Sequence, residues 1–402
     1  MRLPEYLPGH QLRLLQGAQV FFDALVSDID LAIQEVRLET YIFDVHGSGE
    51  RVAQALTRAA RRGVNVYLVM DGVGTPQLPQ AWATQMDAAG VHWVIFSPLG
   101  KLGLLVPNRW RRLHRKLCVV DGKLAYCGGI NVLDDWWDPN YGQLEAPRFD
   151  FAVRISGPLV RQVHDAMVQF WWRFQAARSA KRVNWAGAWQ ALQQAVNDKR
   201  ATVSTTPCGQ DGALAQLVLR DNVHYRSRIE RAYSQALGEA QQDVILANAY
   251  FLPSRKIRRG LVNAAQRGVR VRLLLQGRYD YFMSYHGTRA LYGDLLAGGV
   301  EIYEYQSSFL HAKVAVVDER WATVGSSNID PLSLLLAREA NVVVADVGFA
   351  ASLRAQLEHA LQHQAIRLDV RQHASRSISQ KMLDRVALLL MHALLLLTGK
   401  RY

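Results

Sequence analysis

Short apolar runs of strand length alternate along the chain with longer segments in which apolar residues recur at helical spacing. Helical patterns cover residues 19–34, 49–62 and 78–89, and strand patterns cover 36–43, 64–70 and 91–96. A strand hairpin is expected around residues 114–127. Helices that alternate with buried strands pack on the faces of a mixed sheet, so the pattern predicts an α/β fold.

The order of elements recurs from about Asn222, and the amino acids themselves repeat. Residues 59–72 match residues 264–277, and in both copies a helix end and a glycine precede a buried strand. The repeat predicts two similar α/β/α halves with mixed sheets covered by helices, related by a pseudo-twofold axis and sharing one active site. The expected parts are a first half over 1–195, a second over 196–370 and a tail over 371–402.

Composition narrows the choice of partner. The 402 residues include 47 Lys and Arg against 35 Asp and Glu, a formal net charge of +12 that favours nucleic acid, an anionic membrane or a phosphorylated substrate. With 50% hydrophobic residues the chain is neither disordered nor a polytopic membrane protein. The three cysteines, Cys118, Cys127 and Cys208, show no metal-ligand spacing, which argues against structural zinc and fits a reducing compartment.

The C-terminal region holds an unusual apolar segment. Residues 386–397 read VALLLMHALLLL, which is shorter than the roughly 20 residues that a membrane span needs. Basic residues flank it, so we expect a helix that lies in the interface of an anionic membrane. The alternative is a helix docked on the protein core, which needs only one apolar face. The N-terminus shows no signal-peptide pattern.

The best-matched polar motif of the two halves has the pattern HxKxxxxD followed by GxxN. Its two copies cannot be a coincidence in a chain of this composition. In the first half the motif supplies His114, Lys116, Asp121 and Asn131; in the second half it supplies His311, Lys313, Asp318 and Asn328.

Alternate residues of a strand share a face, so each His should project beside its Lys. Two such units that meet on an axis would offer one imidazole as nucleophile, the other as general acid, and Lys and Asn side chains for phosphate oxygens. The lysines already supply positive charge, so we expect no metal or other cofactor. A single His–Lys pair could equally be a structural cluster, but a matched second copy favours an active site.

A carboxylate is expected beside each imidazole, to fix its tautomer. Asp150 and Glu339 each stand at the start of an apolar strand, and we expect Asp150 to orient His114 and Glu339 to orient His311. The alternative is that both are solvated acids at strand ends. Asp121 and Asp318 occur at turns, where they are more typical of backbone anchors than of proton carriers.

The paired motifs resemble those of the phospholipase D superfamily. Residues 39–43, 248–253 and 321–331 resemble bacterial cardiolipin synthases, particularly the short B type without N-terminal transmembrane helices. The resemblance implies that the whole motif is catalytic and that a phosphatidyl group passes from a phospholipid such as phosphatidylglycerol to another lipid's hydroxyl. It further implies a phosphohistidine intermediate on His114, acid–base catalysis by His311, and a phosphate or carboxylate contact from Ser326, where the first half has Gly129.

The family also implies a location and a partner. We expect a peripheral protein on the cytoplasmic face of the bacterial inner membrane that binds anionic phospholipid, with no nucleic-acid partner. A twelve-residue insertion within residues 97–113 is expected to form an interfacial lip or to fold back on the core. The alternatives are a nuclease or other diesterase of the same superfamily, or a non-catalytic lipid-binding scaffold. The physiological donor and acceptor and the oligomeric state stay open.

Overall fold

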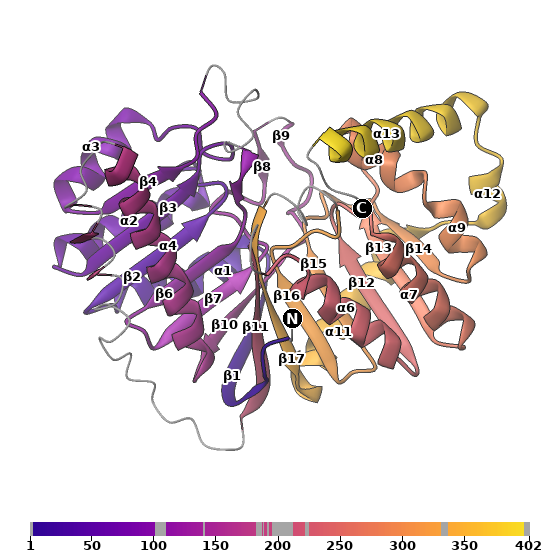
Figure 1. Ribbon diagram of the computed structural model, residues 1–402, viewed down its shortest axis with the longest axis horizontal. Coiled ribbons are helices and arrows are strands. Elements are labelled where there is room, and N and C mark those ends of the chain that lie inside the picture. The colour runs from indigo at the N-terminus through magenta and orange to yellow at the C-terminus, as the bar shows by residue number, and fades with distance from the viewer. Residues whose placement is uncertain are drawn as a thin grey trace.

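The computed structural model describes residues 3–100, 110–139, 141–181, 187, 189–190, 193–194, 212–221, 225–330 and 337–397. Its centre is one mixed sheet of sixteen strands that runs through both halves of the molecule (Figure 1). The predicted insertion between 97 and 113 lies mostly outside the described residues, as does the predicted boundary between residues 195 and 196. Residues 173–181, which approach this boundary and are rich in polar side chains, belong to the end of a long helix.

The two halves of the sheet have the same strand order, and they join where their first strands pair antiparallel. From the junction outward, the first half contains β1 (Leu7–Gln16), β10 (Phe151–Ser156), β7 (Leu124–Gly128), β6 (Lys116–Val120), β2 (Glu35–Thr40), β3 (Asn65–Asp71) and β4 (His92–Phe96). The second half contains β11 (Ala213–Arg220), β17 (Ala337–Ala345), β16 (Trp321–Gly325), β15 (Lys313–Val317), β12 (Asp243–Asn248), β13 (Arg270–Gln276), β14 (Glu301–Tyr305) and the edge strand β18 (Ala365–Arg367).

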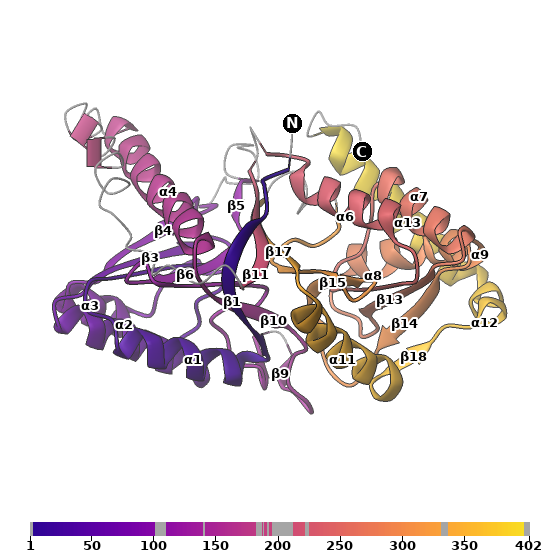
Figure 2. The same cartoon turned by 90° about the horizontal axis from the view of Figure 1, so that it is seen from below.

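Helices cover both faces of this sheet, as the alternating pattern predicts. The first half carries α1 (Ala18–Asp30), α2 (Ser48–Arg61), α3 (Gln80–Ala89) and α4 (Leu159–Lys181); the second carries α6 (Arg228–Glu239), α7 (Arg255–Gln266), α8 (Phe282–Arg289), α9 (Tyr292–Ala297) and α11 (Val347–His363). Figure 2 shows α1 and α2 on the side of α11, and α4 on the side of α6 and α7. The equivalent helices α1 and α6, and likewise α2 and α7, thus lie on opposite sides of the sheet in this view.

The repeated segment shows why these elements form. In α2 the apolar residues Val52, Leu56 and Ala59 are buried, and Ile257, Leu261 and Ala264 are buried at corresponding places in α7. Each helix ends at a glycine in the left-handed region, with φ of 89° at Gly63 and 90° at Gly268. Glycine adopts this conformation without steric strain, so the chain turns sharply into β3 or β13.

The buried core crosses from one half to the other. One cluster of buried side chains contains Val119 and Val153 of the first half together with Val316 and Val342 of the second. Cys127 of the first half donates to the carbonyl of Ala340, with 3.7 Å between sulfur and oxygen. The halves are therefore packed as one body.

The C-terminal segment forms α13 (Ile378–Leu397), which follows the short α12 (Val370–Ala374) and packs along α8. Ala387 and Met391 are buried against the core, while Leu389 and Leu390 are 68% and 51% exposed. The helix is thus docked by one face, which was the alternative to an interfacial helix, and its other face remains apolar and open. Among the described residues, no helix is both long and apolar enough to cross a bilayer.

Asp121 and Asp318 anchor the chain that leads into β2 and β12. The Asp121 carboxylate accepts hydrogen bonds from the backbone N–H groups of Ile33, Gln34 and Glu35. Asp318 does the same for Gln241, Gln242 and Asp243. Both aspartates lie beyond the far end of the strand that begins near the motif histidine. This geometry matches the anchoring role expected from their turn positions and places neither in the active-site cavity.

Replacing Asp318 should therefore destabilise the protein. Asp318→Ala leaves three N–H donors without their acceptor and places Ala at a φ of 51°, so we expect a loss of about 2 kcal/mol in the free energy of unfolding. Asp318→Asn keeps an oxygen acceptor and tolerates this φ, so its loss should be smaller. Urea unfolding measures both. Unchanged stability combined with lost activity would instead give Asp318 a chemical role.

Candidate active site

The two motif histidines are held at the boundary between the halves by backbone pairing. β5 (Arg112–Leu113) runs parallel to the start of β17, and the N–H of His114 donates to the carbonyl of Arg338 at 3.0 Å. In the symmetric arrangement, Phe149 bridges to Leu310, and the N–H of His311 donates to the carbonyl of Phe149 at 2.9 Å. Each histidine is therefore attached to the acid-bearing strand of the other half.

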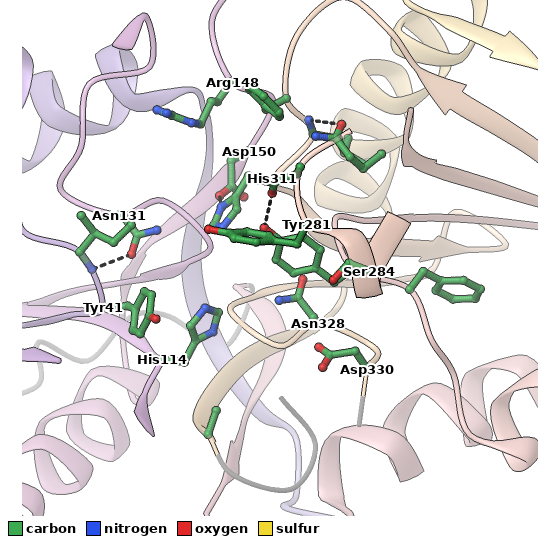
Figure 3. A pocket seen from close by; sticks show the side chains of 18 of the residues that line it. Tyr41, His114, Asn131, Arg148, Asp150, Tyr281, Ser284, His311, Asn328 and Asp330 are labelled. Carbon is green, nitrogen blue, oxygen red and sulfur yellow. Dashed lines mark hydrogen bonds and ion pairs between the residues drawn. The ribbon is translucent and has the colours of Figure 1, made fainter. Parts of the chain in front are cut away.

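Both histidines line one cavity of about 570 Å³ at the carboxyl ends of β2 and β12. Figure 3 shows His114 beside Tyr41 and His311 beside Asp150, with Asn328 and Asp330 on the opposite wall. Each half contributes polar groups and apolar side chains to the lining. The predicted single shared site is thus formed, on the axis that relates the halves.

The carboxylates are exchanged between the halves, and here the predicted pairing is wrong. Nδ1 of His114 lies 2.9 Å from Oε1 of Glu339 and also near the carbonyl of Ser326. Nδ1 of His311 lies 2.6 Å from Oδ2 of Asp150. The sequence predicts that each acid serves the histidine of its own half, but the parallel pairing between the halves brings it to the other one.

These contacts fix which nitrogen of each ring carries a proton. Carboxylate and carbonyl oxygens only accept hydrogen bonds, so Nδ1 of each histidine must be the donor. The lone pair of a neutral ring is then on Nε2, which is the nitrogen available for attack or for proton transfer. Both imidazoles are thus prepared in the same tautomer.

Burial sets the protonation of the site. It lowers the pKa of His114 and, together with the positive charges of Lys313 and Lys116, holds the pKa of His311 well below its usual range. Burial also raises the pKa of Asp150 to about 6. Both imidazoles are consequently neutral near pH 7 before an anion enters, as a nucleophile and a proton acceptor require.

Lys116 and Lys313 lie beneath the cavity rather than in its lining. Each Nζ donates to the backbone carbonyl of its own histidine, with a separation of 2.6 Å for Lys116. Burial lowers the pKa of Lys116 to about 7 and that of Lys313 to about 8. Each ammonium is thus held at the backbone of its own histidine, and the charges of the two lysines raise the electrostatic potential around both imidazoles.

Of the three residues predicted to bind phosphate, two line the cavity and one does not. Asn131 and Asn328 line the cavity, and the side-chain oxygen of Asn131 accepts from the N–H of Ile42 at 3.1 Å. Ser326, however, is buried and donates its hydroxyl to Glu339. The carboxylate contact expected as one possibility for Ser326 is therefore present, and a phosphate contact is not part of this arrangement.

Gly129 stands in the first half where the second half has Ser326, and a steric constraint explains the absence of a side chain there. A β-carbon on Gly129 would lie 2.3 Å from Oδ1 of Asp150, so no side chain fits there. Asp150 occupies, with its shorter side chain, the space next to residue 129, whereas Glu339 leaves room for the Ser326 hydroxyl. The difference between Gly129 and Ser326 is thus explained by the different lengths of the Asp150 and Glu339 side chains.

Sequence reasoning missed several lining residues. Tyr41 and Tyr250, which lie within the segments 39–43 and 248–253 and carried no expected role, line the cavity. Arg148, which also had no expected role, binds Asp138 at 2.7 Å and lines the cavity, where its charge adds to burial and the lysines in lowering the pKa of His311. Arg112 lines the first-half side and binds Asp71 at 3.0 Å.

In the described part of the chain, no group of three potential metal ligands occurs.

A duplicated α/β unit, with one His–Lys–Asp motif per copy and a cavity on the axis between them, defines a phospholipase D-like protein. The family described as "Cardiolipin synthase, PLD-like domain" matches residues 25–144 and 233–361. Cardiolipin synthase B of Escherichia coli K12 is 38% identical over 349 residues, which cover 87% of this chain and 80% of that protein. The protein of Shigella flexneri with the same name matches equally.

A more distant relative and a solved structure are also similar to this chain. Cardiolipin synthase A of Salmonella arizonae is 28% identical over 382 residues, covering 94% of this chain and 74% of the relative. The crystal structure of phosphatidylserine synthase from Haemophilus influenzae superposes with a TM-score of 0.67 at 11% identity, covering 98% of this chain and 95% of that one. The chain belongs to the cardiolipin synthase family with phospholipase D-like domains, which confirms the resemblance.

The buried lysines predict an early loss of activity at alkaline pH. Their lowered pKa values mean that positive charge disappears as the pH rises through about 7 to 8, rather than near the usual value of about 10. We therefore expect kcat/KM, which reports the free enzyme, to fall above about pH 8. A profile that remains flat to about pH 10 would contradict this electrostatic role.

Proposed function

We propose that the protein is a cardiolipin synthase that transfers a phosphatidyl group from phosphatidylglycerol to the hydroxyl of a second phospholipid and releases glycerol. The observation that carries the proposal is the pair of imidazoles in one cavity, each with Nδ1 held by a carboxylate. Such a pair supplies a nucleophile and a proton carrier for two successive displacements at one phosphorus. The family relationship supports a phospholipid as the substrate.

In the first step, Nε2 of His114 attacks the phosphorus while the bond from phosphorus to the glycerol oxygen breaks. His311 gives a proton to the departing oxygen, so neutral glycerol leaves. In the second step, His311 takes the proton from the acceptor lipid's hydroxyl, whose oxygen attacks the phosphorus and releases His114. The assignment of His114 as nucleophile follows the family resemblance.

Substrate binding allows His311 to take up from water the proton that it needs as an acid. An anionic phosphodiester in the cavity favours the charged form of a neighbouring imidazole and raises its pKa. His311, neutral in the empty site, can then bind the proton that it later donates. Asp150 stabilises the resulting imidazolium through its contact with Nδ1.

Charge that develops on the phosphate oxygens has several partners. Lys116 and Lys313 act from below the histidines, and Arg148 and the amides of Asn131 and Asn328 act from the walls. Preorganised donors in a site shielded from water stabilise such charge more strongly than water does. Apolar lining by Phe251, Leu252, Phe309 and Leu310 suits the glycerol and acyl parts of a lipid.

The substrates reside in a bilayer, so the proposal includes peripheral attachment to the cytoplasmic face of the inner membrane. A formal net charge of +12 supports binding to anionic lipid. The open apolar face of α13 supports contact with the acyl region.

The products identify the reaction. Purified protein in detergent micelles with labelled phosphatidylglycerol should form labelled cardiolipin and free glycerol in equal amounts, with EDTA present throughout, because the lysines and arginine supply the positive charge. Phosphatidylethanolamine has no free hydroxyl, so mass spectrometry with and without this lipid tests whether it also serves as a donor, which would release ethanolamine instead of glycerol. Formation of phosphatidic acid alone would show a diesterase, and cleavage of nucleic acid without lipid turnover would show a nuclease.

The exchanged carboxylates predict which variants share a phenotype. We expect His311→Asn and Asp150→Asn to accumulate a phosphatidyl adduct on His114, because both impair the proton carrier while leaving the nucleophile in place. His114→Asn should form no adduct, and Glu339→Gln should form it at least about tenfold more slowly.

Rapid quenching with labelled lipid, followed by peptide mass spectrometry, measures both the yield and the site of the adduct. An adduct on His311 would reverse the two roles. If Glu339→Gln instead accumulated the adduct and Asp150→Asn did not, each acid would serve the histidine of its own half.

A further inference from the structure

We propose that the protein docks on an anionic phospholipid bilayer with the face that surrounds the cavity mouth, using an aromatic rim and the outer face of α13 together. The aromatic rim consists of Trp136, Trp137, Tyr141, Tyr279 and Tyr281, all of which are exposed. The inference rests on the proposed function, because it identifies the surface by which that site receives its lipids.

The aromatic rim is built from both halves and closes across the axis. Trp137 lies in β8 (Trp137–Asp138), which pairs with β9 (Gly142–Gln143) in a small ribbon separate from the main sheet. Tyr141, beside β9, donates its hydroxyl to the backbone carbonyls of Tyr279 at 3.3 Å and Asp280 at 3.1 Å. Asp138 and Asp280 line the cavity, so the exposed rings next to them encircle its opening.

The chemistry of these rings fits a bilayer interface. Trp and Tyr combine an apolar ring with a polar group and gather at the level of lipid headgroups. In this protein the side chains of Trp136, Trp137 and Tyr281 are 46%, 46% and 55% exposed, whereas aromatic side chains such as Phe149 and Phe151 are buried in the core. Because they lie beside the cavity proposed to bind lipid, contact of these rings with a bilayer is favoured over exposure to water.

The second part of the surface is the outer face of α13. Met382, Val386, Leu389 and Leu390 recur at helical spacing and are exposed, whereas Asp384, Ala387 and Met391 face inward. Asp384 fixes the orientation of the helix by contacts with His286 at 2.8 Å and Arg376 at 2.9 Å. The apolar stripe is therefore held outward by a buried charge cluster and cannot simply roll against the core.

Two observations connect this helix with a membrane and with the cavity. Lys381 and Arg385 are exposed on the same helix, so the apolar stripe is flanked by positive charge that complements anionic headgroups. On its inner face Met391 lines the active-site cavity, together with Met283 and Ser284 of α8. The helix is thus a wall shared by the bilayer surface and the site, along which an acyl chain can pass.

Both parts lie along one side of the molecule and border the cavity. In Figure 1, β8, β9 and α13 lie along the upper side. Asp138 of β8 and Met391 of α13 line the cavity. A lipid that enters from this side meets apolar and aromatic groups first and the histidines below them.

The test uses full-length protein carrying His114→Asn, so that no product forms during the measurement. Two double variants remove the proposed contacts, Trp136→Ser with Trp137→Ser and Leu389→Ser with Leu390→Ser. None of these four residues lines the cavity. A matched control, Leu31→Ser with Ile33→Ser, removes two exposed aliphatic side chains before β2, at the end of that strand opposite Tyr41.

Co-sedimentation with vesicles of phosphatidylglycerol and phosphatidylethanolamine measures the partition coefficient. We expect each test variant to bind at least about tenfold more weakly, and the control to change by less than about twofold. In the His114 background without other changes, binding should weaken as salt rises from about 0.05 to about 0.5 M. In the active enzyme, the same variants should turn over monomeric short-chain lipid at close to the normal rate.

Unchanged vesicle binding in both test variants, or an equal loss in the control, would overturn the proposal. A change in oligomeric state in light scattering, without a change in vesicle binding, would show that a second copy covers this face instead. Circular dichroism checks that each variant is folded. Because binding is measured without catalysis, a failure of the proposed reaction leaves this result unaffected.

Discussion

The hydrogen bonds from each imidazole to the carboxylate of the opposite half are the interactions on which this site depends. They require that β5 pair with the start of β17 and that Phe149 bridge to Leu310. These pairings in turn require the antiparallel junction of β1 with β11 and a core to which both halves contribute. Neither half alone contains a histidine with its acid. The continuous sheet is therefore a condition for the chemistry, since it fixes two half-sites at one spacing and orientation.

The same exchange concentrates charge in a buried place. Two lysines, two carboxylates and two imidazoles lie around one cavity, and burial would be costly for unpaired ions. Because of this cost, burial lowers the pKa values of the lysines and histidines and raises that of Asp150. Fewer of these groups are therefore charged when the cavity is empty. A phosphodiester anion reverses this tendency because its charge favours protonation of its neighbours. In the proposed mechanism, protonation of His311 is thereby coupled to the arrival of substrate.

Sequence patterns were sufficient for the repeat, the helix-covered mixed sheet and the motif residues, because each of these leaves a local or periodic trace. No such pattern indicates which carboxylate binds which histidine. Asp150 and Glu339 occupy equivalent positions in a twofold molecule, so pairing within or across the halves is compatible with the same sequence, and only strand pairing at the axis decides. Arg148 was similarly hidden, because a residue before a strand can face solvent or a cavity. The apolar tail gave a helix, but its twelve apolar residues did not reveal which face Asp384 would turn inward.

The contrast between Gly129 and Ser326 has a consequence for how such a duplicated chain can diverge. Residue 129 touches Asp150, and Ser326 touches Glu339, so each acid and its supporting neighbour are encoded in the same half, while the histidine they serve is encoded in the other. A larger side chain at residue 129 would therefore require the acid beside it to move, and with it the contact that holds the histidine of the other half. The two imidazoles are consequently unequal, since an aspartate holds Nδ1 of His311 and a longer glutamate, itself bound by a serine hydroxyl, holds Nδ1 of His114.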